Sequence, residues 1–163
     1  MLSALLLTTA TLLCALTAGF VFAFSVVVMP GIRTLPDRDF LRAFKVMDRI
    51  IQNNSPWFVL VWAGSVVALI AAAVLNVPVL AGMPRLLLIG AVVLYVLGVQ
   101  LPTFVVNVPL NNQLQATDLT ILDAARLQQA RIAFESRWVF WNVFRTVMGV
   151  LVAVMLLLVL HMS

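Results

Sequence analysis

Three long stretches without charge, and a fourth with a single arginine, constrain what this chain can fold into more than any other feature. Residues 1–32, 50–84 and 86–117 contain no Asp, Glu, Lys or Arg, and residues 138–163 contain only Arg145. A helix needs about 20 consecutive apolar residues to cross the hydrocarbon core of a bilayer. The sequence therefore predicts four membrane spans, at roughly residues 5–29, 57–79, 86–106 and 139–160.

The composition indicates an integral membrane protein. Of its 163 residues 64% are hydrophobic and 10% are charged. A soluble domain of this length has too little interior to bury so much apolar surface. We expect residues 1–163 to form a single membrane domain, an all-α bundle of four transmembrane helices with an amphipathic interfacial helix between spans one and two.

The interfacial helix is predicted at residues 37–53, where the sequence gives a helix one apolar face and one basic face. Apolar and basic side chains recur there at helical spacing: Phe40, Phe44, Met47 and Ile51 on one face, and Arg38, Arg42, Lys45 and Arg49 on the other. This composition is typical of a helix that lies in the headgroup layer. Such a helix serves either as a plain connector or as a lid over the bundle.

The basic residues predict how the chain is oriented. Residues 33–49 hold five Lys or Arg and residues 107–137 hold three, whereas the short loop between spans two and three holds only Arg85. The positive-inside rule puts both long loops in the cytoplasm and both termini outside, in a bacterial inner or plasma membrane. The net charge of +4 then reflects topology, so the expected partners are membrane lipids and not nucleic acid.

Span one carries a stripe of small residues and a helix-breaking sequence. Ala15, Gly19 and Ala23 recur at intervals of four, which lets a neighbouring helix approach closely. We interpret the stripe as packing within the chain, with a homo-oligomer through the same residues as the alternative. Residues 29–31, Met-Pro-Gly, are predicted to end the helix, because proline cannot continue it.

Arg145 is the clearest candidate for a functional residue. A charge near the bilayer centre costs roughly 2.5–3.5 kcal/mol on insertion scales, so such residues usually mark a site. Trp138, Trp141 and Asn142 share its helix face at spacings of three, four and seven, and together these groups could hold a flat or anionic molecule. In the alternative, Arg145 extends to the interface as an anchor and the tryptophans belong to an aromatic belt.

The loop between spans three and four supplies candidate partners for Arg145. Asn107 and Asn111 flank Pro109, and their amide oxygens are the nearest plausible acceptors for the guanidinium, although Asn beside Pro is also ordinary turn chemistry. Residues 120–123 resemble a capping box and predict a helix that runs from residue 121 into span four. Arg131 and Glu135 lie four apart on it and can form an ion pair.

Several kinds of site are excluded by composition. His161 is the only histidine and Cys14 the only cysteine, so no internal disulfide and no nitrogen or sulfur metal cluster can form. Along a helix His161 lies about 24 Å from Arg145. The chain contains no phosphate-binding loop or dinucleotide fingerprint. We therefore predict neither a metal nor a cofactor.

Three motifs, taken in order along the chain, resemble those of the anthrone oxygenase-like membrane proteins. They are Gly19-x-x-Phe22-Ala23-Phe24-Ser25 leading to Met29-Pro30, Asn107-x-Pro109-Leu110-Asn111, and Trp138-x-x-Trp141-Asn142-x-x-Arg145. The resemblance implies a membrane helix fold. For the characterised fungal members of polyketide pathways it also implies oxidation of an anthrone to an anthraquinone by O2, with no known cofactor, whereas most bacterial members have no assigned activity.

This reaction needs a flat pocket, a base and a stabiliser of the resulting anion. Trp138 and Trp141 could stack on the rings, and Arg145 could stabilise the oxyanion with Asn142, Asn107 and Asn111 as further donors. The base would have to be Glu135 or Asp48, because no histidine is near. The competing hypothesis is a non-catalytic bundle that binds a lipid, a quinone or a partner membrane protein.

Overall fold

The computed structural model describes residues 1–162, and all regular secondary structure in this part of the chain is helical, without strands. Helices labelled η are π-helical, with a wider turn than the α-helix. The elements are α1 (Leu2–Ala23), η1 (Phe24–Val28), α2 (Met29–Arg33), α3 (Asp37–Gln52), α4 (Pro56–Asn76), α5 (Gly82–Leu94), η2 (Tyr95–Gln100), η3 (Thr103–Asn107), α6 (Val108–Ala116) and α7 (Ala124–Met162).

Adjoining elements combine into four helices that are long and apolar enough to cross a membrane. They span Leu2–Arg33, Pro56–Asn76, Gly82–Ala116 and Ala124–Met162. The predicted all-α fold with four such helices is confirmed. At 1.5 Å per residue α7 is about 58 Å long, nearly twice the hydrocarbon thickness, so one part of it must extend beyond the membrane core.

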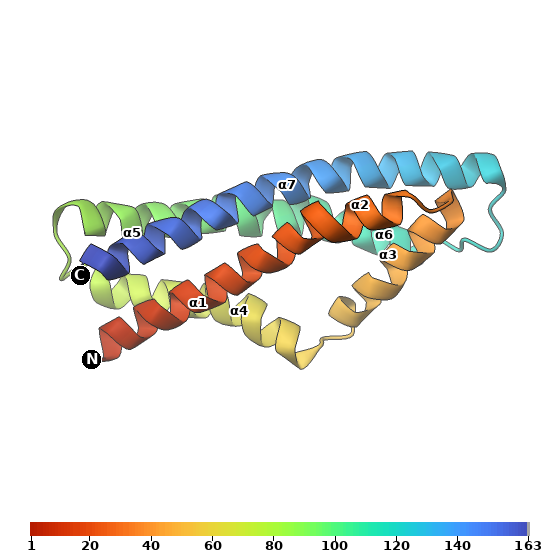
Figure 1. Cartoon of the computed structure of the whole chain (residues 1–163). Helices are drawn as coiled ribbons and strands as arrows, with labels where there is room; N and C mark the ends of the chain where they lie inside the picture. Colours follow the sequence, from red (N-terminus) through yellow and green to blue (C-terminus); the bar gives the residue numbers. More distant parts are fainter. Residues whose placement is uncertain (163) are drawn as a thin grey trace.

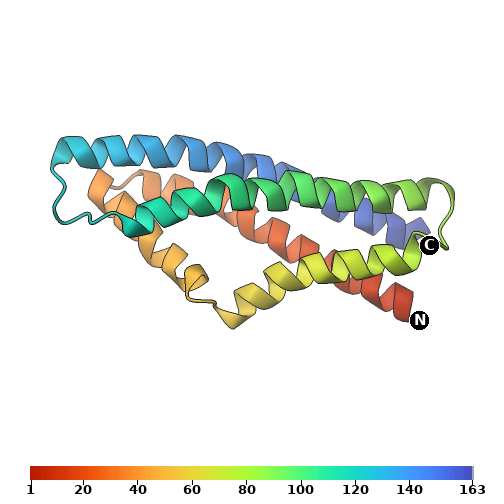
Figure 2. The same ribbon diagram turned by 180° about the vertical axis from the view of Figure 1, so that it is seen from behind.

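The long helices lie side by side, and both termini are at the same end of the molecule (Figure 1). α1 packs between α4 and α7, and α5 packs on α7. The helix α3 and the connections at residues 34–36 and 117–123 lie at the opposite end, as the view from behind also shows (Figure 2). This end carries both basic loops.

The predicted helix end at residues 29–31 is wrong. The first helix continues through Pro30 to Arg33, because the preceding turn widens into η1. A π-helical turn and a nearby hydroxyl can satisfy the backbone groups that a proline leaves free in a membrane helix. The π-helical segment η1 ends directly before Met29, and near its start the Ser25 hydroxyl also donates to the Val21 carbonyl at 3.1 Å. Pro102 and Pro109 likewise adjoin the π-helical segments η2 and η3.

The stripe of small residues on α1 points away from the other helices. Ala15, Gly19 and Ala23 are exposed, and a Cβ added to Gly19 would meet no atom within 4 Å. The interpretation as packing within the chain is therefore wrong, while pairing between two copies stays a prediction. The close approach uses another face of α1, where a Cβ on Gly149 would lie 3.1 Å from that of Ala18.

The apolar face of α3 packs against protein. Phe40, Leu41 and Phe44 are at most 2% exposed, and α3 contacts both α6 and α7. Asp48 lies on this buried side as well, which the alternation of apolar and basic residues did not indicate. The helix thus covers the end of the long helices instead of resting on lipid alone.

Two hydrophobic clusters divide the interior along the helix axes. The first fills the end near the termini and includes Leu69, Tyr95 and Val152. The second lies beneath α3 and includes Phe44 and Phe134. Each long helix except α4 passes from one cluster to the other through buried polar residues, which are Thr17 on α1, Gln100 and Thr103 on the third helix, and Asn142, Arg145 and Thr146 on α7.

Candidate functional site

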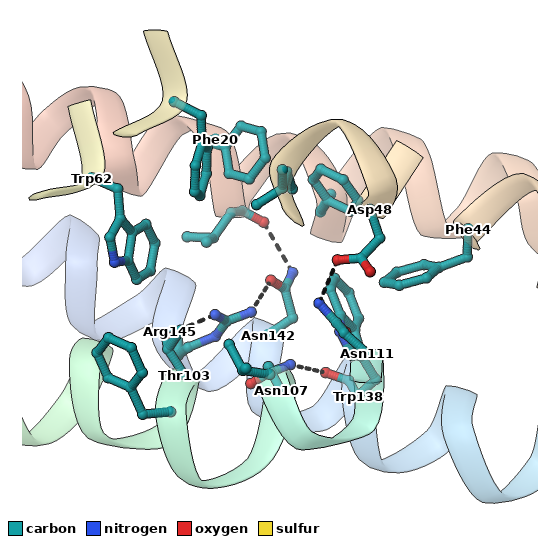
Figure 3. Close-up of a pocket in the computed structure, with 16 residues that line it drawn as sticks. Phe20, Phe44, Asp48, Trp62, Thr103, Asn107, Asn111, Trp138, Asn142 and Arg145 are labelled. Carbon is teal, nitrogen blue, oxygen red and sulfur yellow. Dashed lines mark hydrogen bonds between the residues drawn. The ribbon is translucent and has the colours of Figure 1, made fainter. Parts of the chain in front are cut away.

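A cavity of about 250 Å³ lies in this polar layer (Figure 3). An apolar cavity of about 150 Å³ is known to hold benzene, so this one has room for a molecule of more than one ring. Its walls come from all four long helices and from α3. The lining residues are Phe20, Val21, Phe24, Phe44, Asp48, Ile51, Phe58, Trp62, Thr103, Phe104, Asn107, Val108, Asn111, Trp138, Asn142 and Arg145.

Arg145 is buried in the wall with only neutral partners. Its side chain is 4% exposed, and its Nη1 and Nη2 donate to Thr103 Oγ1 and Asn142 Oδ1, each at 2.9 Å. Within residues 1–162 it forms no ion pair, and its Nε has no hydrogen-bond partner. The guanidinium therefore stays inside the protein, with its charge uncompensated and next to the cavity.

The expectation that Asn107 or Asn111 accepts from Arg145 is wrong. Asn107 Nδ2 donates to the carbonyl of Trp138 at 3.3 Å, which places Asn107 level with Trp138. Trp138 precedes Arg145 by seven residues, about 10 Å along the helix. Because the third and fourth long helices are antiparallel, the residue that lies opposite the guanidinium is Thr103.

Asn142 is held so that its oxygen faces Arg145. Its Nδ2 donates to the Val21 carbonyl at 3.0 Å and to Ser25 Oγ at 2.8 Å. Ser25 Oγ in turn lies 3.0 Å from Thr146 Oγ1. These contacts fix the amide in one orientation, so Asn142 positions the guanidinium and ties α7 to η1.

A second chain of hydrogen bonds joins Trp138 to Asp48. Trp138 Nε1 donates to Asn111 Oδ1 at 2.8 Å, and Asn111 Nδ2 donates to Asp48 Oδ1 at 2.7 Å. The ring of Trp138 also lies 6.0 Å from the Arg145 guanidinium carbon, at the outer limit of a cation–π contact.

Another polar atom of this layer has no hydrogen-bond partner. In the described chain Asn107 Oδ1 is buried without one.

Asp48 is a buried carboxylate in the cavity wall. It is 3% exposed, and its Oδ2 accepts from Gln52 at 2.7 Å and from Gln115 at 2.9 Å. Burial raises the pKa of Asp48 above the ordinary aspartate value, although hydrogen bonds from Gln115, Asn111 and Gln52 act to lower it. A carboxylate of raised pKa beside a cavity is suited to accept a proton.

Two of the expected site residues do not line the cavity. Glu135 accepts hydrogen bonds from Arg33 Nε at 2.6 Å and from Arg131 Nε at 2.8 Å, and Arg131 also binds Asp37 at 3.0 Å. The predicted pair of Arg131 and Glu135 is thus confirmed. Trp141 instead contacts Phe140 and Phe144, with ring centroids 5.6 and 5.4 Å apart.

Glu135→Gln should lower stability modestly, since it removes the shared acceptor of two arginines that tie α2 to α7. We expect a loss of roughly 1 kcal/mol, or about 2–4 °C in the unfolding temperature, measured by circular dichroism in detergent micelles. Asp39→Asn, on the exposed side of α3, is the control. An unchanged unfolding temperature at low salt would show that these ion pairs do not hold the helices together.

Sequence reasoning missed much of the aromatic wall and one polar contact. Phe58 and Trp62 of α4 line the cavity, and their rings stack with centroids 5.7 Å apart. They were missed because span two contains no ionisable residue that would indicate a site. Their spacing of four at one end of a span was the available signal. For Thr103, the available signal was its position next to Pro102, where its hydroxyl donates to the Val99 carbonyl at 2.7 Å.

Fold and site together define a class: a multi-pass membrane protein of four long helices with a polar cavity among aromatic side chains. The chain belongs to the anthrone oxygenase family, whose sequence profile matches residues 2–155. This agrees with the resemblance of the three motifs. No match was found among curated proteins or among solved structures.

Proposed function

We propose that this protein oxidises a flat aromatic compound of the anthrone type with O2, without a cofactor, in the cavity beside Arg145. The observation that carries the proposal is a buried guanidinium without a counter-ion, in the same cavity wall as a buried carboxylate. A neutral substrate that becomes an anion during the reaction would supply the missing negative charge. Family membership supports the same chemistry.

The reaction balances without any further reagent. An anthrone loses a proton from its CH2 group, and the electron pair enters the ring system as an enolate. This anion gives one electron to O2, and the two radicals combine to a hydroperoxide at the same carbon. Loss of the second hydrogen as a proton, with cleavage of the O–O bond, yields the second carbonyl and one water.

Residues of the cavity wall match these needs. Asp48 is the proposed base, because its carboxylate lies in the cavity wall and its pKa is raised by burial. Arg145, oriented by Asn142 and Thr103, stabilises the negative oxygen of the enolate. Trp138 and the neighbouring phenylalanines stack on the rings, and Asn107 and Asn111 complete the polar wall.

The proposal is tested by supplying an anthrone to the purified protein in micelles. We expect O2 uptake above the uncatalysed rate, with one anthraquinone, measured by its absorbance, formed for each O2 consumed. Micelles without protein give the background rate. Added catalase changes the measured O2 uptake only if the reaction releases peroxide, so it distinguishes that outcome from the expected stoichiometry. A rate equal to the background at every substrate concentration would contradict the oxygenase.

The uncompensated charge of Arg145 also favours a second candidate, a bundle that binds an anionic lipid or a quinone without reaction. The carbonyl oxygens of the quinone, or the headgroup oxygens of the lipid, would accept hydrogen bonds from the guanidinium. Quenching of tryptophan fluorescence by an added quinone, in a protein that shows no O2 uptake, would support this function over the first.

We further propose a bacterial inner or plasma membrane location with both termini outside. The observation in favour is that the eight basic residues of the long loops gather at the end away from the termini. The cavity then lies toward the cytoplasmic side. A C-terminal reporter that is active only in the cytoplasm should stay inactive, and activity would reverse this orientation.

A further inference from the structure

We propose that the ligand of this cavity enters sideways from the bilayer, through a membrane portal formed by Phe20, Phe58, Trp62, Phe104 and Val108. The inference rests on the proposed function and narrows its substrate class. The substrate is a planar molecule dissolved in the membrane, and its oxygen-bearing edge faces inward to Arg145. Three features of the structure carry this inference.

First, the cavity is closed toward both ends of the helices. On the side of the termini the first hydrophobic cluster includes Leu69, Leu88 and Val152, each at most 1% exposed. On the opposite side α3 closes the interior, where Phe44 contacts Phe134 and Trp138 with ring centroids 4.6 and 5.0 Å apart. A water-borne molecule would have to separate one of these clusters to reach Arg145.

Second, the cavity is open on its lipid side. Phe104 lines it although 63% exposed, and Phe20 and Val108 line it although 37% exposed. In both ribbon views α4 diverges from the third long helix toward its own start at Pro56 (Figures 1 and 2). α4 meets that helix at Ser65, whose hydroxyl lies 2.6 Å from the Tyr95 hydroxyl, and the portal residues of α4 precede this contact.

Third, the chemistry of the wall changes from the portal inward. The portal is apolar and mostly aromatic, whereas the inner wall carries Thr103, Asn142 and Arg145, which are at most 6% exposed. A planar aromatic edge can pass between aromatic side chains and stack on them. Its polar edge gains hydrogen bonds only at the inner wall, so the gradient also orients the ligand.

The test measures how fast anthraquinone, an unreactive planar probe, binds to the protein in lipid vesicles. Stopped-flow quenching of tryptophan fluorescence reports association without requiring turnover. Val108→Trp should narrow the portal and slow association by about 10-fold or more, since the rate then depends on passage through it. Val105→Trp is the matched control, because Val105 is 60% exposed on the same segment and does not line the cavity.

A second variant and the lipid content make the result decisive. Phe104→Ala should speed association, the opposite change, while Val105→Ala should not. In wild type the rate should follow the mole fraction of probe in the membrane as lipid is added at constant total probe. Equal rates in Val108→Trp and Val105→Trp, or a rate that follows the aqueous concentration, would overturn the portal.

The two proposals fail in different ways. Absence of O2 uptake, with normal binding of anthraquinone that the portal variants change, would contradict the proposed oxygenase activity and support the portal. Normal turnover with association that no portal variant changes would leave the oxygenase and overturn the portal. Absence of any binding together with absence of O2 uptake would contradict both.

Discussion

Arg145→Met should lower kcat for anthrone oxidation by about 100- to 1,000-fold, the usual loss when one donor to a developing oxyanion is removed. Arg145 lines a cavity, is 4% exposed and has no carboxylate partner in the described chain, so its charge is free to act on a bound anion. Methionine keeps an unbranched, flexible stem that extends about as far as the Nε of arginine, while removing the charge and all donors.

The same variant should unfold within a few degrees of wild type. Removing an unpaired buried charge is favourable for the folded state, since that charge gains nothing from an ionic partner. Against this, Asn142 Oδ1 loses its donor at a cost of about 1–3 kcal/mol. The two effects oppose each other, so lost activity with retained stability separates a functional arginine from a structural one.

Two further variants sharpen this comparison. Arg145→Lys keeps the charge but loses the planar, two-pronged donor geometry, so its kcat should fall between those of wild type and Arg145→Met. Arg137→Met is the control, because Arg137 is exposed on the same helix and does not line the cavity. Full turnover in purified Arg145→Met would remove Arg145 from the reaction and favour the anchor interpretation.

Asp48→Asn should lower kcat/KM by about 100- to 10,000-fold, the range that a positioned general base contributes. The substitution keeps the shape of the side chain but removes its ability to accept a proton. Asp48→Glu, which restores the carboxylate on a longer stem, should recover part of the rate. Asp39→Asn on the exposed side of α3 is the control, and equal losses in both variants would contradict a specific role for Asp48.

The pH dependence identifies the group that titrates. Asp48 acts in its charged form, so kcat/KM of wild type should fall as the pH drops through the raised pKa of Asp48. The groups in contact with this carboxylate are the neutral amides of Gln52, Asn111 and Gln115, while Arg145 lines the same cavity. In Asp48→Asn this acid limb should vanish after the uncatalysed rate is subtracted.

Stability should show the opposite trend with pH. Because the native pKa of Asp48 exceeds the unfolded one, the native state holds this proton more tightly. The contribution of Asp48 to the free energy of unfolding is therefore greatest at acid pH. It declines as the pH rises from an ordinary aspartate pKa to the raised native value, and unfolding temperatures of wild type and Asp48→Asn across this range check the sign.

The choice between Glu135 and Asp48 illustrates why sequence separation misleads. Glu135 is ten residues from Arg145 on the same helix, which places it about 15 Å away along the axis. It is held there by Arg33 and Arg131. Asp48 is far away in sequence, yet α3 folds back over the end of the long helices and brings it to the cavity.

What the sequence alone determined follows from local physics. Three stretches without charge and a fourth with only Arg145 predict the membrane helices, and a period of 3.6 residues places Trp138, Asn142 and Arg145 on one face of α7. The family was also visible in three short motifs. Each of these features depends on neighbours within one helix, so no knowledge of the other helices was needed.

Only the tertiary structure decided what meets across the helices. The partner of Arg145 is Thr103, the stripe of Ala15, Gly19 and Ala23 faces outward, and α4 supplies Phe58 and Trp62 to the cavity. Rotation and register of one helix against another are set by the packing of many side chains distant in sequence. A pattern within one helix carries no measure of that register.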